Sequence, residues 1–569
     1  MSKTDEPISG AESGAEAILR QLTVAGVDCL FVSPIAVMAP LWELIAARGE
    51  HERPAYYRCR HEALAVALAS GYYKATGRSQ VVFLPTSLGV QNGAMALRTA
   101  LLERTPMTVL SPDTLTYGES PDVDPGPEWP SLLVDFWGPA RDGELVTKWA
   151  RQARTSAELI HELRRALYLT DSVPRGPTLL EIPFDLLLGP ASPIVHPLLR
   201  SSRPTANADE IDAATEALAS AETPLIITEY LGRTSDERQD LVRVAEALGA
   251  PVFEFMSPAF RTFPRNHPLY GAGAVEPVVG QADAILVAGC NAPWHPPLQA
   301  LKPGCTVIHL EEDPLRPRAP YYGYRTTHCL AGDRALNLKA LADRLWTQPS
   351  STPARLERWR AYSASVRAQG IEQAEAARAQ SADAVPAAEL FRALHRLLPE
   401  SAICVDEIIA PMPQMMQFLY EEKPFEQFRG WMGALGTSLG TALGVKLARP
   451  QSPVVCIVGD GAWHYNPIPA ALGFSQEYGV PLLLVLCNNR QYASQTWNVL
   501  RYYPDGAAVR TGNFVGNKIE PMPDYVKTVE AYGGAGERVQ SIEALEPAIR
   551  RGLEVIGEGR TFLLDTVLQ

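Results

Sequence analysis

Residues 454–492 restrict the fold of this chain more than any other stretch. An apolar run, Val454–Val458, leads into Gly459-Asp460-Gly461, and a second apolar run, Leu482–Cys487, ends in Asn488-Asn489. The residues between the two runs suffice for a loop, a helix and a return to a neighbouring strand. The pattern therefore predicts one βαβ unit of a parallel sheet.

This unit would bring two oxygen-bearing side chains together. The carboxyl ends of parallel strands lie side by side, so Asp460 and Asn489 should reach one edge of the sheet, where α/β proteins bind ligands. A carboxylate and an amide oxygen beside a glycine-rich turn at a helix start suit a hard divalent cation bound to a diphosphate. The alternative is a chance Gly-Asp-Gly in an ordinary dinucleotide-binding unit.

The rest of the chain repeats the alternation of strands and helical stretches. We predict an α/β fold of three domains, each a parallel sheet flanked by helices, at residues 12–190, 205–346 and 385–569. Two predicted linkers separate them, Ala191–Asn207 and a second that comprises Gln348–Pro353 and the polar helix after it, to about Ala384. Ser111–Pro130, rich in Pro and Asp, is predicted to be a surface loop.

Apolar runs and helical spacing indicate the elements of each domain. The first domain is predicted to contain helices at Ala15–Ala25 and His61–Thr76 and strands at Cys29–Val32, Gln80–Leu84, Met107–Leu110 and Thr178–Ile182. The second is predicted to contain strands at Leu225–Thr228, Ala284–Ala288 and Thr306–Leu310, and the third further strands at Ala402–Val405 and Phe562–Val567.

Composition excludes several partners. The chain has 569 residues and a net charge of −13, with no run rich in Lys or Arg, so nucleic acid and anionic membranes are not expected partners. No apolar run is long enough to span a bilayer, and the polar, acidic N-terminus does not resemble a signal peptide. The eight cysteines are scattered without a CxxC pair, which favours free thiols in the cytoplasm.

A second acidic residue stands out far upstream. The stretch Arg60-His61-Glu62-Ala63-Leu64-Ala65 opens an Ala-rich helix that ends with Ala75-Thr76-Gly77, and Glu62 is the one acid at its otherwise apolar start. A carboxylate in the first turn commonly does no more than favour the helix dipole.

Taken together, these motifs resemble those of thiamine-diphosphate (ThDP) enzymes of the benzoylformate decarboxylase and acetolactate synthase type. The resemblance covers nearly the whole chain and implies pyrimidine-binding, central and diphosphate-binding domains, in that order. It implies that Glu62 activates the aminopyrimidine of ThDP and that Mg²⁺ is held by Asp460, Asn489 and the backbone carbonyl of Gln491.

The resemblance also implies further cofactor contacts. Leu435, in the glycine-rich stretch from Trp431 to Gly444, falls where the family places the bulky residue that keeps ThDP bent. Asp406-Glu407, after a predicted strand, falls near the cofactor. The remaining expected cofactor-binding residues are Gly433, Gly459, Gly461, Ala462 and Tyr492, with Gly461 and Ala462 offering backbone N–H groups to phosphate.

The chain departs from the family at the substrate. Ala36 stands where a catalytic Ser is expected and Pro85 where an acid–base His is expected, and neither can shuttle a proton. His295 and Gln495 are the candidate catalytic residues that replace them, with Ser87 and Gln91 as further candidates. His61 is expected to orient the helix of Glu62, and His464 to pack behind the diphosphate loop.

Two features after the double Asn could shape the substrate site. Trp497 is predicted either to wall the pocket or to belong to the core. Val499–Asp524, which holds Arg501 and Arg510, is predicted either to be a lid over an anionic substrate or to be a disordered or interface loop.

The leading hypothesis is a ThDP- and Mg²⁺-dependent enzyme that decarboxylates a 2-oxo acid and then releases an aldehyde or ligates a second carbonyl compound to give a 2-hydroxyketone. The alternatives are acyl-CoA chemistry, as in the related oxalyl-CoA decarboxylases and 2-hydroxyacyl-CoA lyases, and a non-catalytic cofactor-binding homologue. The resemblance implies a homodimer or homotetramer in which Glu62 and Asp460 act across a subunit interface. FAD in the central domain is possible, but no motif in the sequence supports it.

Overall fold

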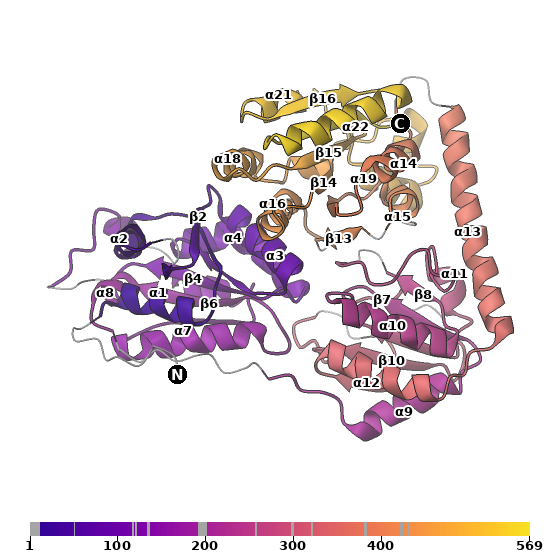
Figure 1. The fold of residues 1–569 in the computed structure, drawn as a ribbon, viewed down its shortest axis with the longest axis horizontal. Helices are drawn as coiled ribbons and strands as arrows, with labels where there is room; N and C mark the ends of the chain where they lie inside the picture. Colours follow the sequence, from indigo (N-terminus) through magenta and orange to yellow (C-terminus); the bar gives the residue numbers. More distant parts are fainter. Residues whose placement is uncertain are drawn as a thin grey trace. The chain divides into compact units, whose positions relative to one another are not determined.

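The computed structural model describes residues 12–49, 52–116, 119, 122–133, 137–191, 202–255, 259–296, 301–319, 323–380, 384–420, 423, 425–430 and 433–569. Most of the predicted first linker, parts of the predicted loop after Ser111, and the residues Trp431 and Met432 lie outside these ranges. The strands of the described part form three sheets in which all pairings are parallel (Figure 1). The prediction of three α/β sheets is therefore confirmed.

The first sheet has six strands in the order β2-β1-β3-β4-β6-β5. These are β1 (Cys29–Val32), β2 (Ala55–Arg58), β3 (Gln80–Phe83), β4 (Met107–Asp113), β5 (Trp149–Gln152) and β6 (Thr178–Pro183). The principal helices are α1 (Gly14–Val24), α2 (Ala39–Ala47), α3 (Glu62–Thr76), α4 (Thr86–Leu102) and α7 (Ser156–Asp171). The four inner strands are almost entirely buried, as expected for a sheet covered on both faces.

The ends of helix α3 have clear physical causes. The Nδ1 atom of His61 accepts a hydrogen bond from the backbone N–H of Ala63 at 3.1 Å, so His61 caps the helix start. Gly77 ends the helix with φ of 72°, a conformation that favours glycine. The expected role of His61 in fixing this helix agrees with its place in the structure.

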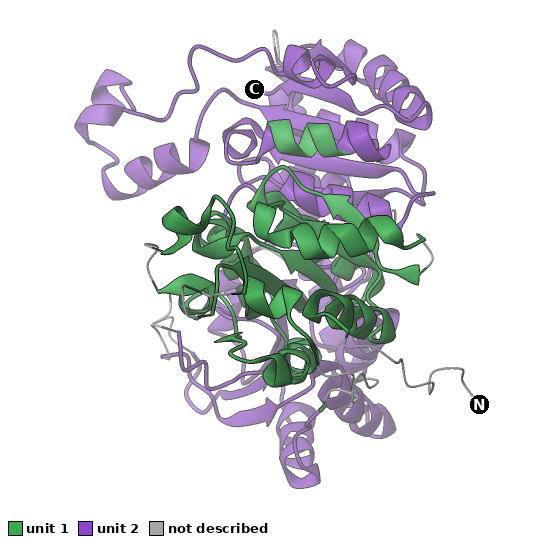
Figure 2. Cartoon of the chain, turned by 90° about the vertical axis from the view of Figure 1, so that its left-hand side faces the viewer, with its two compact units in different colours: residues 1–202, 469–474 green, residues 203–468, 475–569 purple. Residues whose placement is uncertain are grey.

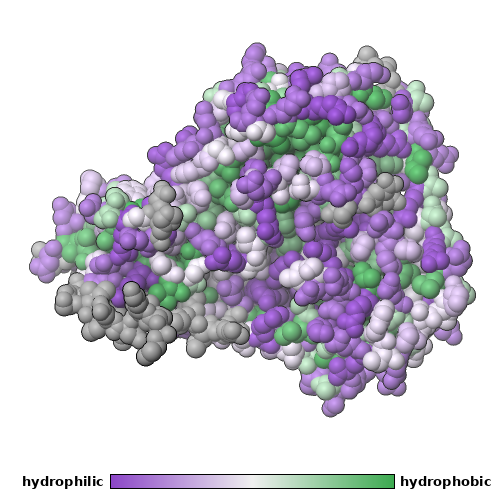
Figure 3. Space-filling model, in the orientation of Figure 1, coloured by the Kyte–Doolittle hydropathy of each residue, from purple (hydrophilic) through white to green (hydrophobic). Residues whose placement is uncertain are grey.

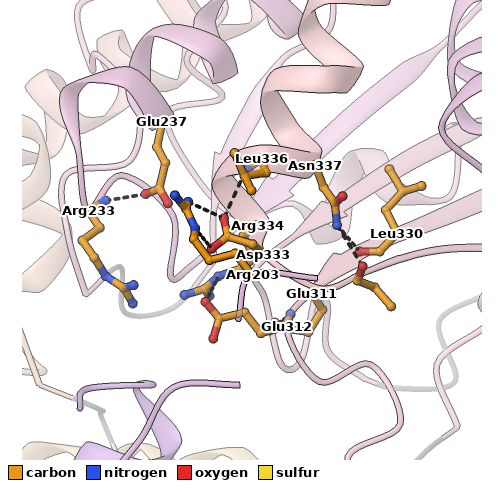
Figure 4. A network of polar contacts seen from close by, with 11 residues as sticks. Arg203, Arg233, Glu237, Glu311, Glu312, Leu330, Asp333, Arg334, Leu336 and Asn337 are labelled. Atoms are coloured by element: carbon orange, nitrogen blue, oxygen red, sulfur yellow. Dashed lines mark hydrogen bonds and ion pairs between the residues drawn. The ribbon is translucent and has the colours of Figure 1, made fainter. Parts of the chain in front are cut away.

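The second sheet has five strands in the order β11-β10-β9-β7-β8. These are β7 (Pro224–Thr228), β8 (Val252–Glu254), β9 (Ala284–Ala288), β10 (Thr306–Glu311) and β11 (His328–Ala331), with helices α9 (Ala208–Ala219), α10 (Ser235–Leu248) and α12 (Arg334–Thr347). Figure 4 shows polar contacts at one end of this sheet, where Asp333 caps α12 and binds the guanidinium of Arg203 at 2.8 and 2.9 Å. The end of the predicted first linker is thus attached to the second sheet.

The third sheet has six strands in the order β13-β12-β14-β15-β17-β16. These are β12 (Ile403–Glu407), β13 (Glu426–Arg429), β14 (Val454–Gly459), β15 (Leu483–Asn488), β16 (Ala535–Val539) and β17 (Phe562–Val567). The principal helices are α14 (Ala387–Leu397), α16 (Ser438–Ala448), α18 (Ile468–Tyr478) and α22 (Ile542–Gly557). β14, α18 and β15 form the βαβ unit predicted from residues 454–492, with β14 paired directly to β15.

The chain divides into two compact units (Figure 2). One comprises residues 1–202 with 469–474, and the other comprises residues 203–468 with 475–569, so the second and third sheets share a unit. Within that unit, the predicted polar helix is α13 (Pro353–Ala379). It does more than link, because the guanidinium of its Arg355 donates to the backbone carbonyls of Leu248 and Ala221.

Two loop predictions are partly wrong. Strand β4 continues through Ser111, Pro112 and Asp113, which pair with β6, so the predicted loop begins three residues later. Residues 499–524 are not a continuous loop, because helix α19 (Ala493–Tyr502) extends into them and α20 (Ala507–Thr511) follows. Proline and aspartate in the first segment, and glycine and proline in the second, favoured loops, but strand pairing and helix formation prevailed.

No helix within the described ranges is long and apolar enough to cross a membrane. All eight cysteines are free, and seven of them are buried.

Candidate active site

A cavity opens where β12, β14 and β15 end in the third sheet. Its lining comes from the end of β12 and the turn after it, from Leu435, from the Gly-Asp-Gly turn and from the segment after β15: Glu407, Ile408, Ile409, Ala410, Pro411, Leu435, Gly459, Asp460, Gly461, Ala462, Cys487, Asn489, Gln491, Tyr492, Ala493 and Ser494. The strand ends thus bring together eight of the predicted cofactor and metal residues: Leu435, Gly459, Asp460, Gly461, Ala462, Asn489, Gln491 and Tyr492.

Asp460 holds an oxygen atom with no partner in the protein. Its Oδ1 accepts a hydrogen bond from the backbone N–H of Gly461 at 2.8 Å, whereas its Oδ2 is buried without a hydrogen-bond partner. Burial raises the pKa of Asp460 to about 6, although backbone N–H groups of Gly461, Arg490 and Gln491 act to lower it. A buried carboxylate oxygen left in this state is costly unless a cation binds it.

The turn after β15 is held rigidly beside Asp460. Arg490 has a positive φ of 57°, and the backbone N–H of Gln491 donates to the side-chain oxygen of Asn489 at 3.2 Å. Two backbone hydrogen bonds fasten this turn to a later segment, from Tyr492 N–H to the Asn517 carbonyl at 2.7 Å and from Ile519 N–H to the Arg490 carbonyl at 2.9 Å. Asn489 and Gln491 therefore keep fixed places on the cavity wall.

Position 461 has no room for a Cβ atom unless the ring of Tyr492 shifts. A Cβ atom at this position would lie 2.8 Å from two ring atoms of Tyr492, which is closer than a real Cβ approaches its neighbours. The ring of Tyr492 therefore lies against bare backbone at the start of the short helix α17 (Asp460–Trp463). Such close-packed backbone beside a strand end is typical of phosphate-binding turns.

The end of β12 forms another part of the cavity wall. The carboxylate of Glu407 accepts backbone N–H bonds from Gly436 at 2.7 Å, Thr437 at 3.0 Å and Ser438 at 2.7 Å. Burial raises the pKa of Glu407, while these three N–H groups act to lower it. Glu407 thus fixes the glycine-rich turn that carries Leu435 into the cavity.

These residues fit a magnesium diphosphate. One carboxylate with a free buried oxygen, one amide oxygen and one backbone carbonyl give an all-oxygen donor set, which Mg²⁺ prefers over Zn²⁺. The described residues contain no group of three or more His, Cys, Asp or Glu side chains that could hold a metal ion, which agrees with a set that has a single carboxylate.

Glu62 lies in the other compact unit, as the first residue of α3. Its Oε1 accepts a hydrogen bond from the hydroxyl of Ser33 at 2.9 Å, and its Oε2 accepts one from the side-chain amide of Asn92. Sequence reasoning missed both partners. Ser33 lies just past β1 and Asn92 on α4, so only the fold brings them to Glu62.

Other predicted residues lie outside the cavity lining. Gly433, His295 and Gln495 are exposed, and none of them lines the cavity, so their assigned roles remain predictions. His295 has its backbone N–H bonded to Glu276 at 3.2 Å. Trp497 is 48% exposed on α19, which excludes the core alternative within this chain.

The remaining candidates have clearer surroundings. Ser87 is buried with no hydrogen-bond partner for its hydroxyl, and Gln91 donates to Asp142 at 2.9 Å. His464 packs against the ring of Tyr525, and burial lowers its pKa. Ile408–Pro411 and Ser494 also line the cavity, and in the sequence only their positions after strand ends could have indicated them.

Comparison with known proteins shows which family the chain is similar to. Three families match along the chain: the N-terminal TPP binding domain, the central domain and the C-terminal TPP binding domain of thiamine pyrophosphate enzymes, at residues 12–126, 211–338 and 412–566. The large subunit of acetolactate synthase isozyme 3 from Escherichia coli is 26% identical, over 98% of this chain and 95% of its own length. A probable 2-ketoarginine decarboxylase from Pseudomonas aeruginosa is also 26% identical, over 95% and 92%.

A solved structure shares the fold. The thiamine diphosphate-dependent 4-hydroxybenzoylformate decarboxylase of Rhodococcus jostii superposes with a TM-score of 0.77 at 22% identity, covering 98% of this chain and 99% of that one. The three domain matches in order, the relatives that extend along nearly the whole chain and the cavity at the predicted motif all agree. The chain belongs to the thiamine-diphosphate-dependent enzymes of the decarboxylase and acetolactate synthase type.

Proposed function

We propose that this enzyme uses ThDP and Mg²⁺ to decarboxylate a 2-oxo acid, and that it then releases an aldehyde or joins the product to a second carbonyl compound. The observation that carries the proposal is the buried, unpartnered Oδ2 of Asp460, on a cavity wall shared with Asn489 and Gln491. Two of the similar proteins carry the names of decarboxylases that act on 2-oxo acids, and a third is an acetolactate synthase.

In this proposal the residues of the third sheet hold the cofactor. Asp460, Asn489 and the carbonyl of Gln491 would bind Mg²⁺, and the N–H groups of Gly461 and Ala462 would bind phosphate oxygens. Leu435 would support the cofactor's bent shape. When bound, ThDP would supply a nucleophilic carbon for the substrate carbonyl and a positively charged ring that can take up the electron pair left when CO₂ departs.

Glu62 would hold the proton on the cofactor's pyrimidine ring. Its two hydrogen bonds, from Ser33 and Asn92, fix the carboxyl group in one orientation, as a catalytic proton donor requires. The apolar wall Ile408–Pro411 would exclude water from the reacting atoms. No described His lines the cavity, so the protein offers no imidazole there to protonate the product, and we propose that carboligation is favoured over aldehyde release.

The proposal includes self-association and a cytoplasmic location. We expect a homodimer or homotetramer, with Glu62 of one copy serving the cofactor held by another. Figure 3 shows an apolar area in the upper part of that view. As a separate observation, Trp497, Leu500 and Val515 are among the exposed large apolar side chains of the described residues. Such areas commonly mark protein interfaces. The seven buried free thiols support a reducing compartment.

A substrate panel tests the proposal. The purified enzyme with ThDP and Mg²⁺ is incubated with pyruvate, benzoylformate and a basic 2-oxo acid, with and without an acceptor aldehyde, while CO₂ release and products are measured. We expect CO₂ from at least one 2-oxo acid, with a 2-hydroxyketone as the main product when the acceptor is present. Binding of ThDP without CO₂ or ligation product from any 2-oxo acid would contradict the proposal. FAD is not part of it, and the absorbance spectrum of the purified enzyme tests that directly.

A further inference from the structure

A continuous series of buried polar contacts runs from the second sheet to the wall of the cofactor cavity. It begins at Glu254, the last residue of β8, whose carboxylate pairs with the guanidinium of Arg265 at 2.9 Å. Both side chains are 1% exposed. Arg265 then reaches the third sheet, because its Nη2 donates to the side-chain oxygen of Gln427 on β13 at 2.8 Å.

Gln427 connects Arg265 to the neighbouring strand β12. Its Nε2 donates to Oδ2 of Asp406 on β12 at 2.9 Å, and the side chain is wholly buried. The primary amide suits this place, since it accepts from the cation of Arg265 and donates to the carboxylate of Asp406. A carboxylate here could not donate, and an apolar side chain would remove one hydrogen bond from each charged group, leaving Arg265 with Glu254 and Asp406 with Arg429.

Arg429 connects Asp406 to the residues that line the cavity. One of its guanidinium nitrogens lies 3.1 Å from Oδ1 of Asp406, and another donates to the backbone carbonyl of Ile408. Ile408 lines the cavity directly after Glu407, which itself holds the glycine-rich turn before α16. The segment 406–408 is thus fixed from one side by the second sheet and in turn fixes the cavity wall.

We propose that Gln427 is a positioning residue for the cofactor cavity. It holds Asp406, and through Arg429 the carbonyl of Ile408, in the geometry that binds ThDP, although it does not line the cavity itself. The inference rests on the proposed ThDP function. The amide of Gln427 makes both the hydrogen bond from Arg265 and the one to Asp406, so replacing it breaks the connection to the segment 406–408 and displaces the cavity wall.

A relocated charge tests the proposal. Gln427→Glu places a second carboxylate against Asp406, and like charges at this distance repel. The double variant Asp406→Asn with Gln427→Glu moves the carboxylate from one position to the other. The total charge is that of the natural protein, and the amide at 406 donates to the carboxylate at 427, which still accepts from Arg265. Gln380→Glu, at an exposed position after α13, is the control for the added charge.

The readout is the Kd of ThDP at saturating Mg²⁺, measured by calorimetry at 20 °C on folded protein, with the thermal midpoint recorded separately. We expect Gln427→Glu to weaken ThDP binding by roughly tenfold. The Kd of the double variant for ThDP should return to within about threefold of that of the natural protein. The Kd of Gln380→Glu should equal that of the natural protein.

Each other outcome is decisive. A lowered thermal midpoint with unchanged ThDP affinity in Gln427→Glu would make Gln427 a stability residue only, and the inference would be overturned. A folded double variant with no recovery would overturn it as well. If the natural protein failed to bind ThDP, the proposed function would fall first, so the two failures are told apart by the natural protein's own affinity.

Discussion

Glu62 and Asp460 are both acids placed at the first position of a helix, yet their surroundings differ. Glu62 has each carboxylate oxygen bound by a side chain, Ser33 on one and Asn92 on the other. Asp460 has one oxygen bound by the neighbouring backbone N–H of Gly461 and the other buried without a partner. The protein completes the first site and leaves the second incomplete.

This difference assigns different tasks to the two acids. A carboxyl group held by two side-chain donors has one fixed orientation and needs nothing more from the chain, which suits a group that keeps or passes a proton. A buried oxygen without a donor is unfavourable until a cation binds, which suits a metal ligand. Replacing Glu62 should therefore lower turnover with little change in ThDP affinity, whereas replacing Asp460 should lower ThDP affinity.

The largest expected effect is on chemistry at Glu62. Glu62→Gln keeps the shape of the side chain and an oxygen that can accept from Ser33, but it removes the exchangeable proton. We expect kcat to fall by roughly 10²- to 10⁴-fold while the Kd of ThDP changes less than about threefold. Steady-state kinetics and calorimetry check the two halves. Retained turnover would mean that Glu62 does not activate the cofactor.

The next effect concerns binding at Asp460. Asp460→Asn preserves volume but removes the charge that meets the cation, so ThDP affinity at fixed Mg²⁺ should fall by roughly 100-fold. The protein without cofactor should be as stable as the natural protein or more so, because the variant no longer buries a carboxylate. Asp505→Asn, an exposed position, is the control. A loss of stability together with the loss of binding would indicate a structural Asp instead.

The surroundings of Asp460 were easier to predict from the sequence than those of Glu62. The metal-site residues follow two apolar strands within one βαβ unit, so strand adjacency alone places them together. Glu62 could be recognised from its motif, whereas its partners could not, because Ser33 and Asn92 come from a loop and a helix that only tertiary packing brings to it. Local pattern predicts which elements exist but not which side chains meet between them.

The same limit explains what else was missed. The apolar wall Ile408–Pro411 follows a strand in the same way as Asn489, but nothing in its residue types marks a site. Gly433, His295 and Gln495 are exposed, which their residue types could not indicate, and their roles remain predictions. Gln427 lies on the edge strand β13, and nothing near it in the sequence indicates its contact with Arg265, which is 162 residues away.

A third acid, Glu181, extends the comparison to the pH dependence of stability. Glu181 on β6 resembles Glu62 in that both oxygens are bound, by the side-chain amide of Gln152 and by the N–H of Ala140 at 2.8 Å. Glu181 is buried, and burial raises its pKa to about 7. Its folded pKa is above the unfolded value, so its contribution to stability is fully present below about pH 4.5 and is lost as pH rises to 7.

Glu181→Gln should therefore flatten part of the pH dependence of stability. The natural protein should lose about 1 to 3 kcal/mol in free energy of unfolding from this group between pH 4.5 and 7.5, since one pKa unit corresponds to about 1.4 kcal/mol. Urea unfolding of both proteins at several pH values measures the difference between them. Parallel curves would show that the bound oxygens offset the cost of burial.

The smallest expected effect tests whether the hydrogen bonds at Glu62 matter to its task. Ser33→Ala removes one of its two donors but leaves Asn92, so we expect kcat to fall by about three- to tenfold, with ThDP affinity unchanged. Ser79→Ala is the matched control, because the hydroxyl of Ser79 also donates to a carboxylate, Asp171, at 2.9 Å within the same unit. An equal loss of kcat in both variants would point to general destabilisation. A loss confined to Ser33→Ala would show that the orientation of the Glu62 carboxyl group contributes to turnover separately from its proton.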